Sequence, residues 1–469
     1  MISKALLEYF RCPERYADFA LSGPLCPDTG YFRVGPDTTC YGRTSERSLV
    51  ERAASDARDL SALCSANGSG VVLPFDPTDV AQNLRLERYT HQSAGAQASV
   101  VLPSVVRAAY YFLRPALPVV VRKHLQRLHL RDWQELAFPH WPVDHSLDSL
   151  MERVLTFSLD ANRVDRIPFI WFWPHGAPSC AIVTHDVEAL RGRDFCSELM
   201  DLDDEYGIKA SFQLVPEKRY PVTDRFLDSL RDREFEINIH DLNHDGRLFA
   251  EREEFLRRAD KINGYAEKYN AAGFRSGALY RNADWYDALK FTYDMSIPNV
   301  AHLDPQRGGC CTVMPYFIGR LVELPVTATQ DYTLIQILGE YSMDLWKRQI
   351  ALIVAKHGLV SFIIHPDYFI SDREQALYRN LLAYLVRLRA EQKLWIARPG
   401  DVARWWKVRS RLQLVQDGST WCIRGSGSEQ ARLAFASLDG QRLVYELAPS
   451  QGPVGGLKPT ENSEARLPV

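Results

Sequence analysis

Short apolar runs alternate with longer amphipathic stretches from Cys180 onward, and this alternation is typical of a parallel α/β architecture. Seven runs predict strands, at residues 180–184, 209–215, 235–240, 273–276, 293–296, 321–325 and 360–365. Apolar residues at helical spacing predict helices between them, at 225–233, 251–269, 343–356 and 373–392. The economical fold is α/β, a distorted seven-stranded (β/α) barrel related to the eight-fold version.

The two flanks follow other patterns. Residues 1–165 mix short helical patterns with Gly/Pro-rich stretches, and we interpret them as an amino-terminal extension of unknown role. After Trp406 apolar and polar residues alternate, with hairpin signals at Asp417-Gly418 and Asp439-Gly440. The predicted domains are therefore the extension at 1–165, the barrel at 166–406, a small carboxyl-terminal β module at 407–450 and a disordered tail at 451–469.

Composition and charge narrow the class of protein. A chain of 469 residues with 46% hydrophobic and 25% charged residues can form a large core. The formal net charge is -3 and no block of like charges is present, which argues against a nucleic-acid partner. Nine scattered cysteines without C-x-x-C spacing fit reduced thiols. No run is long enough for a transmembrane segment and no secretory signal is seen, so we expect a cytoplasmic protein.

The apolar and basic segment 110–131 has two interpretations. It would make a peripheral membrane contact if it lay on a lipid surface. Its arginines and lysine are more simply the solvated face of a helix packed on the barrel, and we favour that interpretation.

Polar side chains stand at the carboxyl ends of the predicted strands. Asp186 follows the first strand, His240 and His244 follow the third, Arg275 lies on the fourth and His365 ends the seventh. The active sites of such barrels lie at this end, because the loops there can vary without disturbing the core. This clustering predicts an active site.

Two histidines and two acids make that site a candidate metal centre. His240 and His244 are four residues apart, a spacing that on a helical turn brings both rings to one face. Of Asp186 and Glu188, one acid can bind the cation while the other takes a proton from bound water, since an acid that binds a cation is a weaker base than one that remains free. The alternative is that these acids stabilise the amino terminus of the next helix.

Four motifs in order resemble the polysaccharide deacetylases, the NodB homology family or carbohydrate esterase family 4. They are Thr184-His185-Asp186, His240-x-x-x-His244, Phe274-Arg275-Ser276-Gly277 and Phe362-Ile363-Ile364-His365-Pro366. The likeness covers roughly residues 180–397. The resemblance implies a catalytic base at Asp186 and metal ligands at His240 and His244. Val187 stands where the family has its second Asp, so the third ligand is expected at Glu188, as in family branches with a D-x-D arrangement.

The resemblance also implies roles for the later motifs. Arg275 would hold Asp186 ionised and oriented, and His365 would protonate the departing amine. Asp294 is the expected partner of His365, with Asp304 and Asp367 as competitors. A backbone N–H at Ala278 would help to hold an oxyanion.

Aromatic residues near the site have two interpretations. The rings of Trp173, Trp285 and Trp141 would bind substrate if they stacked on sugar faces, but such residues more often pack in the core or at its rim.

We therefore expect a metal-dependent hydrolase that removes N-acetyl groups from an amino sugar in a glycan or glycan precursor. Zinc is the expected divalent metal, with cobalt, nickel, manganese or iron as alternatives. One rival is a hydrolase of a small non-carbohydrate amide. The other is a catalytically silent glycan-binding module, which the substitution at Val187 favours.

Overall fold

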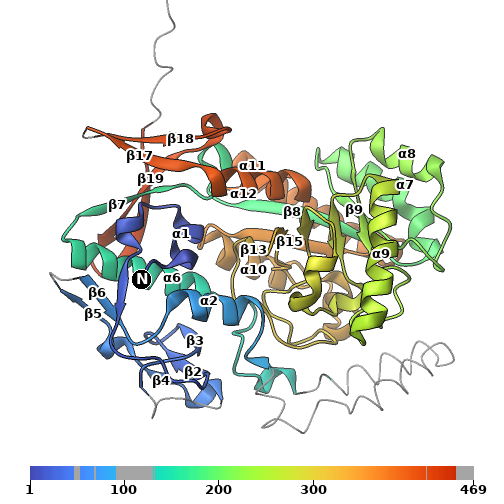
Figure 1. Ribbon diagram of the computed structural model, residues 1–469. Coiled ribbons are helices and arrows are strands. Elements are labelled where there is room, and N and C mark those ends of the chain that lie inside the picture. Colours follow the sequence, from blue (N-terminus) through green and yellow to red (C-terminus); the bar gives the residue numbers. More distant parts are fainter. Residues whose placement is uncertain (47–52, 68–69, 91–129, 131, 419, 450–469) are drawn as a thin grey trace, which may run out of the picture.

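The computed structural model describes residues 1–46, 53–67, 70–90, 130, 132–418 and 420–449 (Figure 1). Its centre is a curled, mostly parallel sheet with the strand order β13-β14-β12-β11-β10-β9-β8-β15, and β16 pairs with the first half of β8. The strands are β8 Cys180–Val187, β9 Ser211–Leu214, β10 Glu236–His240, β11 Gly273–Arg275, β12 Tyr293–Asp294, β13 Tyr316–Ile318, β14 Leu321–Glu323, β15 Leu359–Ile364 and β16 Trp395–Ile396.

The fold class predicted from the sequence, a distorted α/β barrel, is confirmed. All seven predicted strands are present and mutually parallel. The sheet curls until the segment after β14 meets β15, where the Ala328 N–H donates to the Ser361 carbonyl (3.2 Å) and the Ser361 N–H to Thr327 Oγ1 (2.9 Å). The antiparallel β13 and the two-residue β16 were not predicted, because strands so short carry no periodic signal.

Helices cover the outside of the curled sheet. The four predicted helices are confirmed, and the covering set is α7 Leu190–Glu205, α8 Asp224–Arg231, α9 Arg252–Tyr269, α10 Asp344–Val354, α11 Asp372–Ala390 and α12 Pro399–Arg411. Their inner faces bury residues such as Leu199, Phe255 and Trp346 against outward-facing strand residues. Burying each such side chain contributes about 1.5–3 kcal/mol, so the helices hold the strand ends in fixed positions.

The amino-terminal region packs against the barrel rather than standing apart. It contains α1 Lys4–Phe10, α2 Pro77–Arg85, α6 Ser146–Asn162 and two three-stranded sheets, β1-β6-β5 and β3-β2-β4. Their strands are β1 Phe19–Leu21, β2 Gly30–Arg33, β3 Thr39–Gly42, β4 Arg58–Asp59, β5 Ser65–Asn67 and β6 Gly70–Leu73. One apolar cluster joins Phe10 and Leu147 of this region to Ile182 and Tyr293 of the barrel strands.

The carboxyl-terminal strands form both predicted hairpins. β17 Gln413–Asp417 pairs with β18 Thr420–Arg424, and β19 Leu433–Asp439 pairs with β20 Arg442–Leu447. β19 also pairs with β7 Arg166–Ile170, which precedes the barrel in the sequence. The last part of the described chain is thereby attached to the segment that leads into the barrel.

Arg409, at the end of α12, connects three distant parts of the chain. Its guanidinium is 1% exposed and donates to the carbonyls of Tyr9 (2.8 Å), Ile170 (2.8 Å) and Trp171 (3.0 Å). Burial lowers the pKa of Arg409 to about 9. The first helix, the segment around β7 and α12 therefore share one buried donor.

Among the described residues, no helix combines the length and apolar character needed to cross a membrane. The segment 110–131, apart from Leu130, and the tail at 451–469 lie outside the described residues, so both predictions about them stay predictions.

Candidate metal centre

The first strand of the barrel places its two acids on one side. Successive side chains of a strand point to opposite faces. Val187 therefore points outward, where it is fully buried in the cluster that contains Leu199 and Leu214. Asp186 and Glu188 point to the other side, at the carboxyl end of β8.

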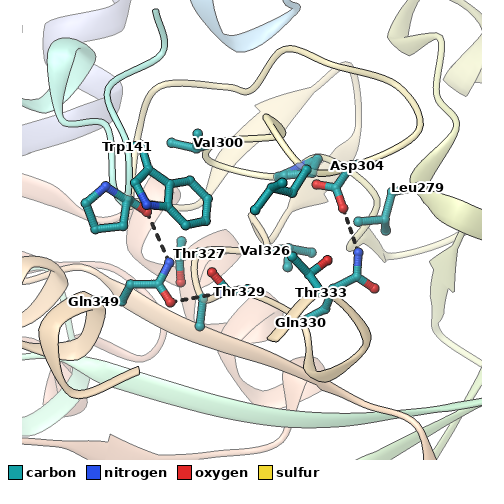
Figure 2. Close-up of a pocket in the computed structure, with 14 residues that line it drawn as sticks. Trp141, Leu279, Val300, Asp304, Val326, Thr327, Thr329, Gln330, Thr333 and Gln349 are labelled. Carbon is teal, nitrogen blue, oxygen red and sulfur yellow. Dashed lines mark hydrogen bonds between the residues drawn. The ribbon is translucent and has the colours of Figure 1, made fainter. Parts of the chain in front are cut away.

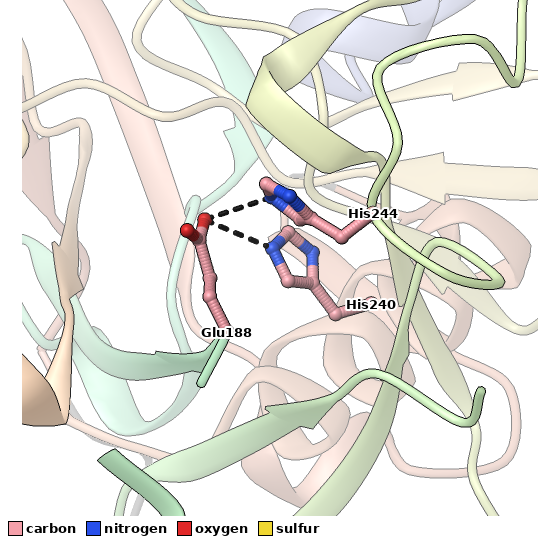
Figure 3. A group of neighbouring side chains, drawn as sticks. All are labelled: Glu188, His240 and His244. Carbon is pink, nitrogen blue, oxygen red and sulfur yellow. Dashed lines mark ion pairs between the residues drawn. The ribbon is translucent and has the colours of Figure 1, made fainter. Parts of the chain in front are cut away.

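Glu188 faces both histidines of the H-x-x-x-H motif (Figure 3). Its Oε1 lies 2.8 Å from His244 Nε2 and 3.5 Å from His240 Nε2. One ligand atom from each of the three residues lies within 4.8 Å of the other two. The residues expected to bind metal are therefore brought together.

The local geometry of the histidine pair differs from the expected helical turn. His240 is the last residue of β10, and the chain then enters a loop in which Asp241 (φ 58°) and His244 (φ 54°) have left-handed backbone conformations. This loop brings the two rings to a centroid distance of 4.8 Å. Gly277 makes room for it, since a Cβ there would lie 2.6 Å from Asp241 Oδ2 and 3.1 Å from His244 Cδ2.

The donor set fits a divalent cation. His240 Nε2 and His244 Nε2 are buried and both face Glu188 Oε1, so the two imidazoles and the carboxylate converge on a point where one cation could take up their lone pairs. His240 Nδ1 lies 3.2 Å from the Arg275 carbonyl, and donation to a carbonyl in this way orients the ring of a metal-binding histidine. His244 Nδ1 lies 3.3 Å from Arg219 Nη2, which can only donate a hydrogen bond. Two imidazoles and one carboxylate form a set that zinc commonly uses in catalytic sites.

Electrostatics in the centre favour ionised acids. Burial raises the pKa of Glu188, but the charge of His244 and hydrogen bonds from the histidines outweigh it and hold that pKa well below its ordinary value. Burial lowers the pKa of His244, and the Glu188 carboxylate outweighs that effect and raises it. The opposing charges thus stabilise each other in this site.

Asp186 is held by Arg275, as the resemblance implies. Arg275 Nη1 donates to Asp186 Oδ1 (2.7 Å) and to Thr184 Oγ1 (2.7 Å), and the guanidinium is fully buried. Burial raises the pKa of Asp186, but the charges of Arg275 and His240 outweigh it, so the pKa is lowered. The second oxygen, Oδ2, lies 3.8 Å from His240 Nε2 and remains beside the proposed metal ligands.

His365, which follows β15, lies at the same centre. The prediction that Asp294 is its partner is wrong. His365 Nε2 lies 3.4 Å from Glu188 Oε1, and Nδ1 lies 2.6 Å from Asp331 Oδ1. Asp294 instead accepts from the Ser296 hydroxyl (2.8 Å) and N–H (3.0 Å), two residues further along the chain. The acid that orients His365 therefore comes from the segment after β14, which sequence reasoning missed.

The competing acids do not take this place either. Asp304 accepts a hydrogen bond from Gln330 Nε2 (2.6 Å), and burial raises its pKa to about 6. Asp367 Oδ1 is buried without a hydrogen-bond partner among the described residues.

Three further residues were expected to bind substrate. The prediction for Trp173 is wrong. This residue precedes β8, so it lies at the end of the sheet opposite the candidate metal centre. It is fully buried there, and its indole N–H donates to the His357 carbonyl (2.6 Å). Trp285 is partly buried and packs on Phe249 and Phe255. Ala278 lies in the turn that follows β11, with φ 54°, directly after Gly277.

Trp141 lines a small cavity at the carboxyl end of β14 (Figure 2). Gln330 and Asp304 face each other across one side of it, and Leu279 of the turn after β11 lies beside them. The cavity has room for little more than a water molecule, about 20 Å³, so it is too small for a sugar ring.

Comparisons with known proteins found no matching family model and no matching curated protein. A solved structure from Mycobacterium smegmatis, assigned as a polysaccharide deacetylase, is 17% identical over 54% of this chain and 98% of its own length, with a TM-score of 0.41. One from Pseudomonas aeruginosa PAO1 with the same assignment is 14% identical over 50% of this chain and 92% of its own, with a TM-score of 0.39. The Puue allantoinase is 13% identical over 50% of this chain and 92% of its own, with a TM-score of 0.38. The solved structures similar to this chain thus belong to the polysaccharide deacetylase family that the four motifs resemble, at low identity over about half of the chain.

Proposed function

We propose that this protein is a metal-dependent hydrolase that removes an N-acetyl group from an amino sugar in a glycan or glycan precursor. The observation that carries the proposal is the convergence of Glu188, His240 and His244 with an Arg-paired acid at the carboxyl ends of the strands. β15 pairs with β8 on the side away from β9 and β10. His365, which follows β15, therefore approaches Glu188 from the side opposite to His240. The set provides a cation site, a base and an acid.

Each residue has a role that its contacts support. A divalent cation bound by Glu188, His240 and His244 would polarise the amide carbonyl and acidify water. Asp186, kept ionised by Arg275, accepts the proton from the attacking water. Burial lowers the pKa of His365, but the charge of Asp331 outweighs this effect and raises the pKa well above its ordinary value. His365 therefore donates a proton to the departing amine. We propose zinc as the metal and the backbone N–H of Ala278 as a donor to the oxyanion.

Val187 does not argue for a silent module. Its side chain faces the helices, so an Asp in its place would point away from the histidines. Glu188, one residue later, supplies the carboxylate on the correct face. We therefore prefer the enzyme over the glycan-binding module.

The test is acetate release from N-acetylated oligosaccharides of glucosamine, with metal content measured in the same preparations. We expect the wild type to release acetate, the chelator to abolish release and Asp186→Asn to lower it about 10²–10⁴-fold while the metal is retained. His244→Ala should lose the stoichiometric metal. Asp160→Asn, an exposed acid on α6, is the control and should match the wild type.

Two outcomes would contradict the proposal. Undiminished release by Asp186→Asn would remove the proposed base. The metal-loaded protein could also release no acetate from any acetylated sugar and yet hydrolyse cyclic ureides or imides. That result would favour the small-amide hydrolase.

A further inference from the structure

A second feature lies at the end of the sheet opposite the metal centre. A cleft of about 470 Å³ separates α12 from the first residues of β10 to β12. Glu236 opens β10, and Ala272 and Thr292 directly precede β11 and β12. His240 lies four residues beyond Glu236, about 13 Å along the strand. The cleft is therefore distinct from the proposed active site.

The wall that α12 contributes to the cleft is basic. Arg404, Lys407 and Arg411 line it at positions separated by three and four residues, so they follow one face of the helix. Arg398, just ahead of the helix, lines it as well. Neighbours on this face are about one helical turn, 5.4 Å, apart along the axis.

Acids neutralise only part of this charge. Arg398 and Arg404 both pair with Asp401, at 3.0 and 2.7 Å. Lys407 and Arg411 have no carboxylate within 4.0 Å among the described residues, and the same holds for Arg320, in the turn between β13 and β14. Burial lowers the pKa of Lys407, and the charges of Arg411 and Arg320 lower it further. Lys407 thus lies near two other cations, and none of the three has a carboxylate in ion-pair range among the described residues.

The floor of the cleft adds little negative charge. Glu236 accepts hydrogen bonds from the Gly400 N–H (3.0 Å) and from Asn238 Nδ2 (3.2 Å), and it contacts the Tyr293 hydroxyl. Burial raises the pKa of Glu236 to about 7, so near neutral pH much of this carboxyl is uncharged. The floor therefore does not offset the cations of the helix.

We propose that this cleft binds a small molecule carrying one or more phosphate groups. Arginine guanidinium groups match phosphate oxygens in a bidentate manner, and an ammonium group adds a point charge. The volume is in the range of small-molecule sites, about 300–1,000 Å³. A long polyanion is disfavoured because Asp401 interrupts the basic face and the whole chain has a formal charge of -3. This inference does not depend on the proposed deacetylase function.

The experiment measures binding of inorganic phosphate, pyrophosphate and tripolyphosphate to the full-length protein by calorimetry, with sodium chloride added to equal ionic strength. We expect the affinity to rise with the number of phosphate groups. The double variant Lys407→Gln/Arg411→Gln should bind at least about tenfold more weakly, as the loss of two charge-assisted contacts predicts. Arg424→Gln/Arg442→Gln removes two exposed arginines from the carboxyl-terminal strands and should bind like the wild type.

A third variant separates this cleft from the metal centre, because phosphates also bind metal ions. His244→Ala should retain phosphate binding. If His244→Ala abolished binding while Lys407→Gln/Arg411→Gln left it intact, the phosphate would be at the metal and the proposal would be overturned. Equal binding by the two double variants, or no binding by the wild type, would overturn it as well.

Discussion

Asp331 holds His365 at two points: Oδ1 lies 2.6 Å from the ring Nδ1, and Oδ2 accepts the backbone N–H of the same residue at 2.7 Å. This double contact fixes the ring so that Nε2 faces Glu188. Because the acid also raises the pKa of the imidazole, it keeps His365 protonated for donation.

Asp331→Asn keeps the shape of this side chain and removes its charge. We expect kcat for acetate release to fall about 10²-fold or more with little change in KM, since the proton donor is misoriented and less basic. Steady-state kinetics at several substrate concentrations measure this, and metal content should be unchanged. Asp344→Asn, an exposed acid on α10, is the control; an unaltered kcat in Asp331→Asn would show that the pair is merely structural.

Glu87 and Arg281 join the amino-terminal region to the turn that carries Ala278. Arg281 is almost fully buried; its Nε donates to Glu87 Oε2 (2.6 Å) and its Nη1 to the Leu279 carbonyl (2.8 Å). Glu87→Gln leaves a buried guanidinium without its counter-charge, which lowers the free energy of unfolding by about 3–5 kcal/mol. Chemical denaturation measures the loss, with the exposed Glu14→Gln as control. A change below about 1 kcal/mol would contradict this role.

Gly277→Ala tests the close approach of the loop that carries His244. The added Cβ would meet Asp241 Oδ2 at 2.6 Å and His244 Cδ2 at 3.1 Å, so Asp241 must shift and the His244 ring must give by a few tenths of an ångström. We expect metal affinity to fall about 10–100-fold, as for other changes in groups that support metal ligands. Competition with a fluorescent chelator measures it. Gly264→Ala, in α9 with no atom near its new Cβ, should bind metal like the wild type; equal affinity in both variants would refute the steric argument.

Glu236 predicts a pH dependence of stability that is separate from the metal centre. Its pKa is about 7 in the folded protein because of burial, against an ordinary value of 4.5. A raised pKa means that the folded state binds the proton more tightly. The contribution is therefore fully present below pH 4.5 and is lost as pH rises through 7, by at most about 3 kcal/mol.

Glu236→Gln should abolish this part of the decline in unfolding free energy between pH 4.5 and 7. Urea denaturation at several pH values in phosphate-free buffer measures it, and Glu253→Gln, exposed on α9, should keep the wild-type profile. Identical profiles for Glu236→Gln and the wild type would contradict the assignment.

The barrel and the proposed metal ligands could be predicted from sequence because both follow from local pattern. Strands such as 360–365 are mostly apolar runs that end in polar residues, and the strand ends then determine which side chains meet. The spacing of Asp186 and Glu188 is the spacing that a strand requires for two side chains on one face.

Other features depend on contacts that no local pattern encodes. The backbone at Asp241 and His244 adopts left-handed conformations that few side chains favour, so the sequence indicated a helical turn instead. Asp331 is 34 residues from His365 and follows β14 by several residues, beyond the strand end where acids were sought. Trp173 could have been rejected, because a residue that precedes a barrel strand lies at the end opposite the site.

The buried guanidinium of Arg409 has a practical consequence for anyone who trims this chain. A recombinant fragment of residues 166–406 would end inside α12 and delete that arginine, leaving the carbonyls of Ile170 and Trp171 without their donor. A fragment of residues 166–449 would keep the arginine but remove its acceptor at Tyr9. Crystallisation and assays are therefore better planned on the intact polypeptide than on an excised barrel.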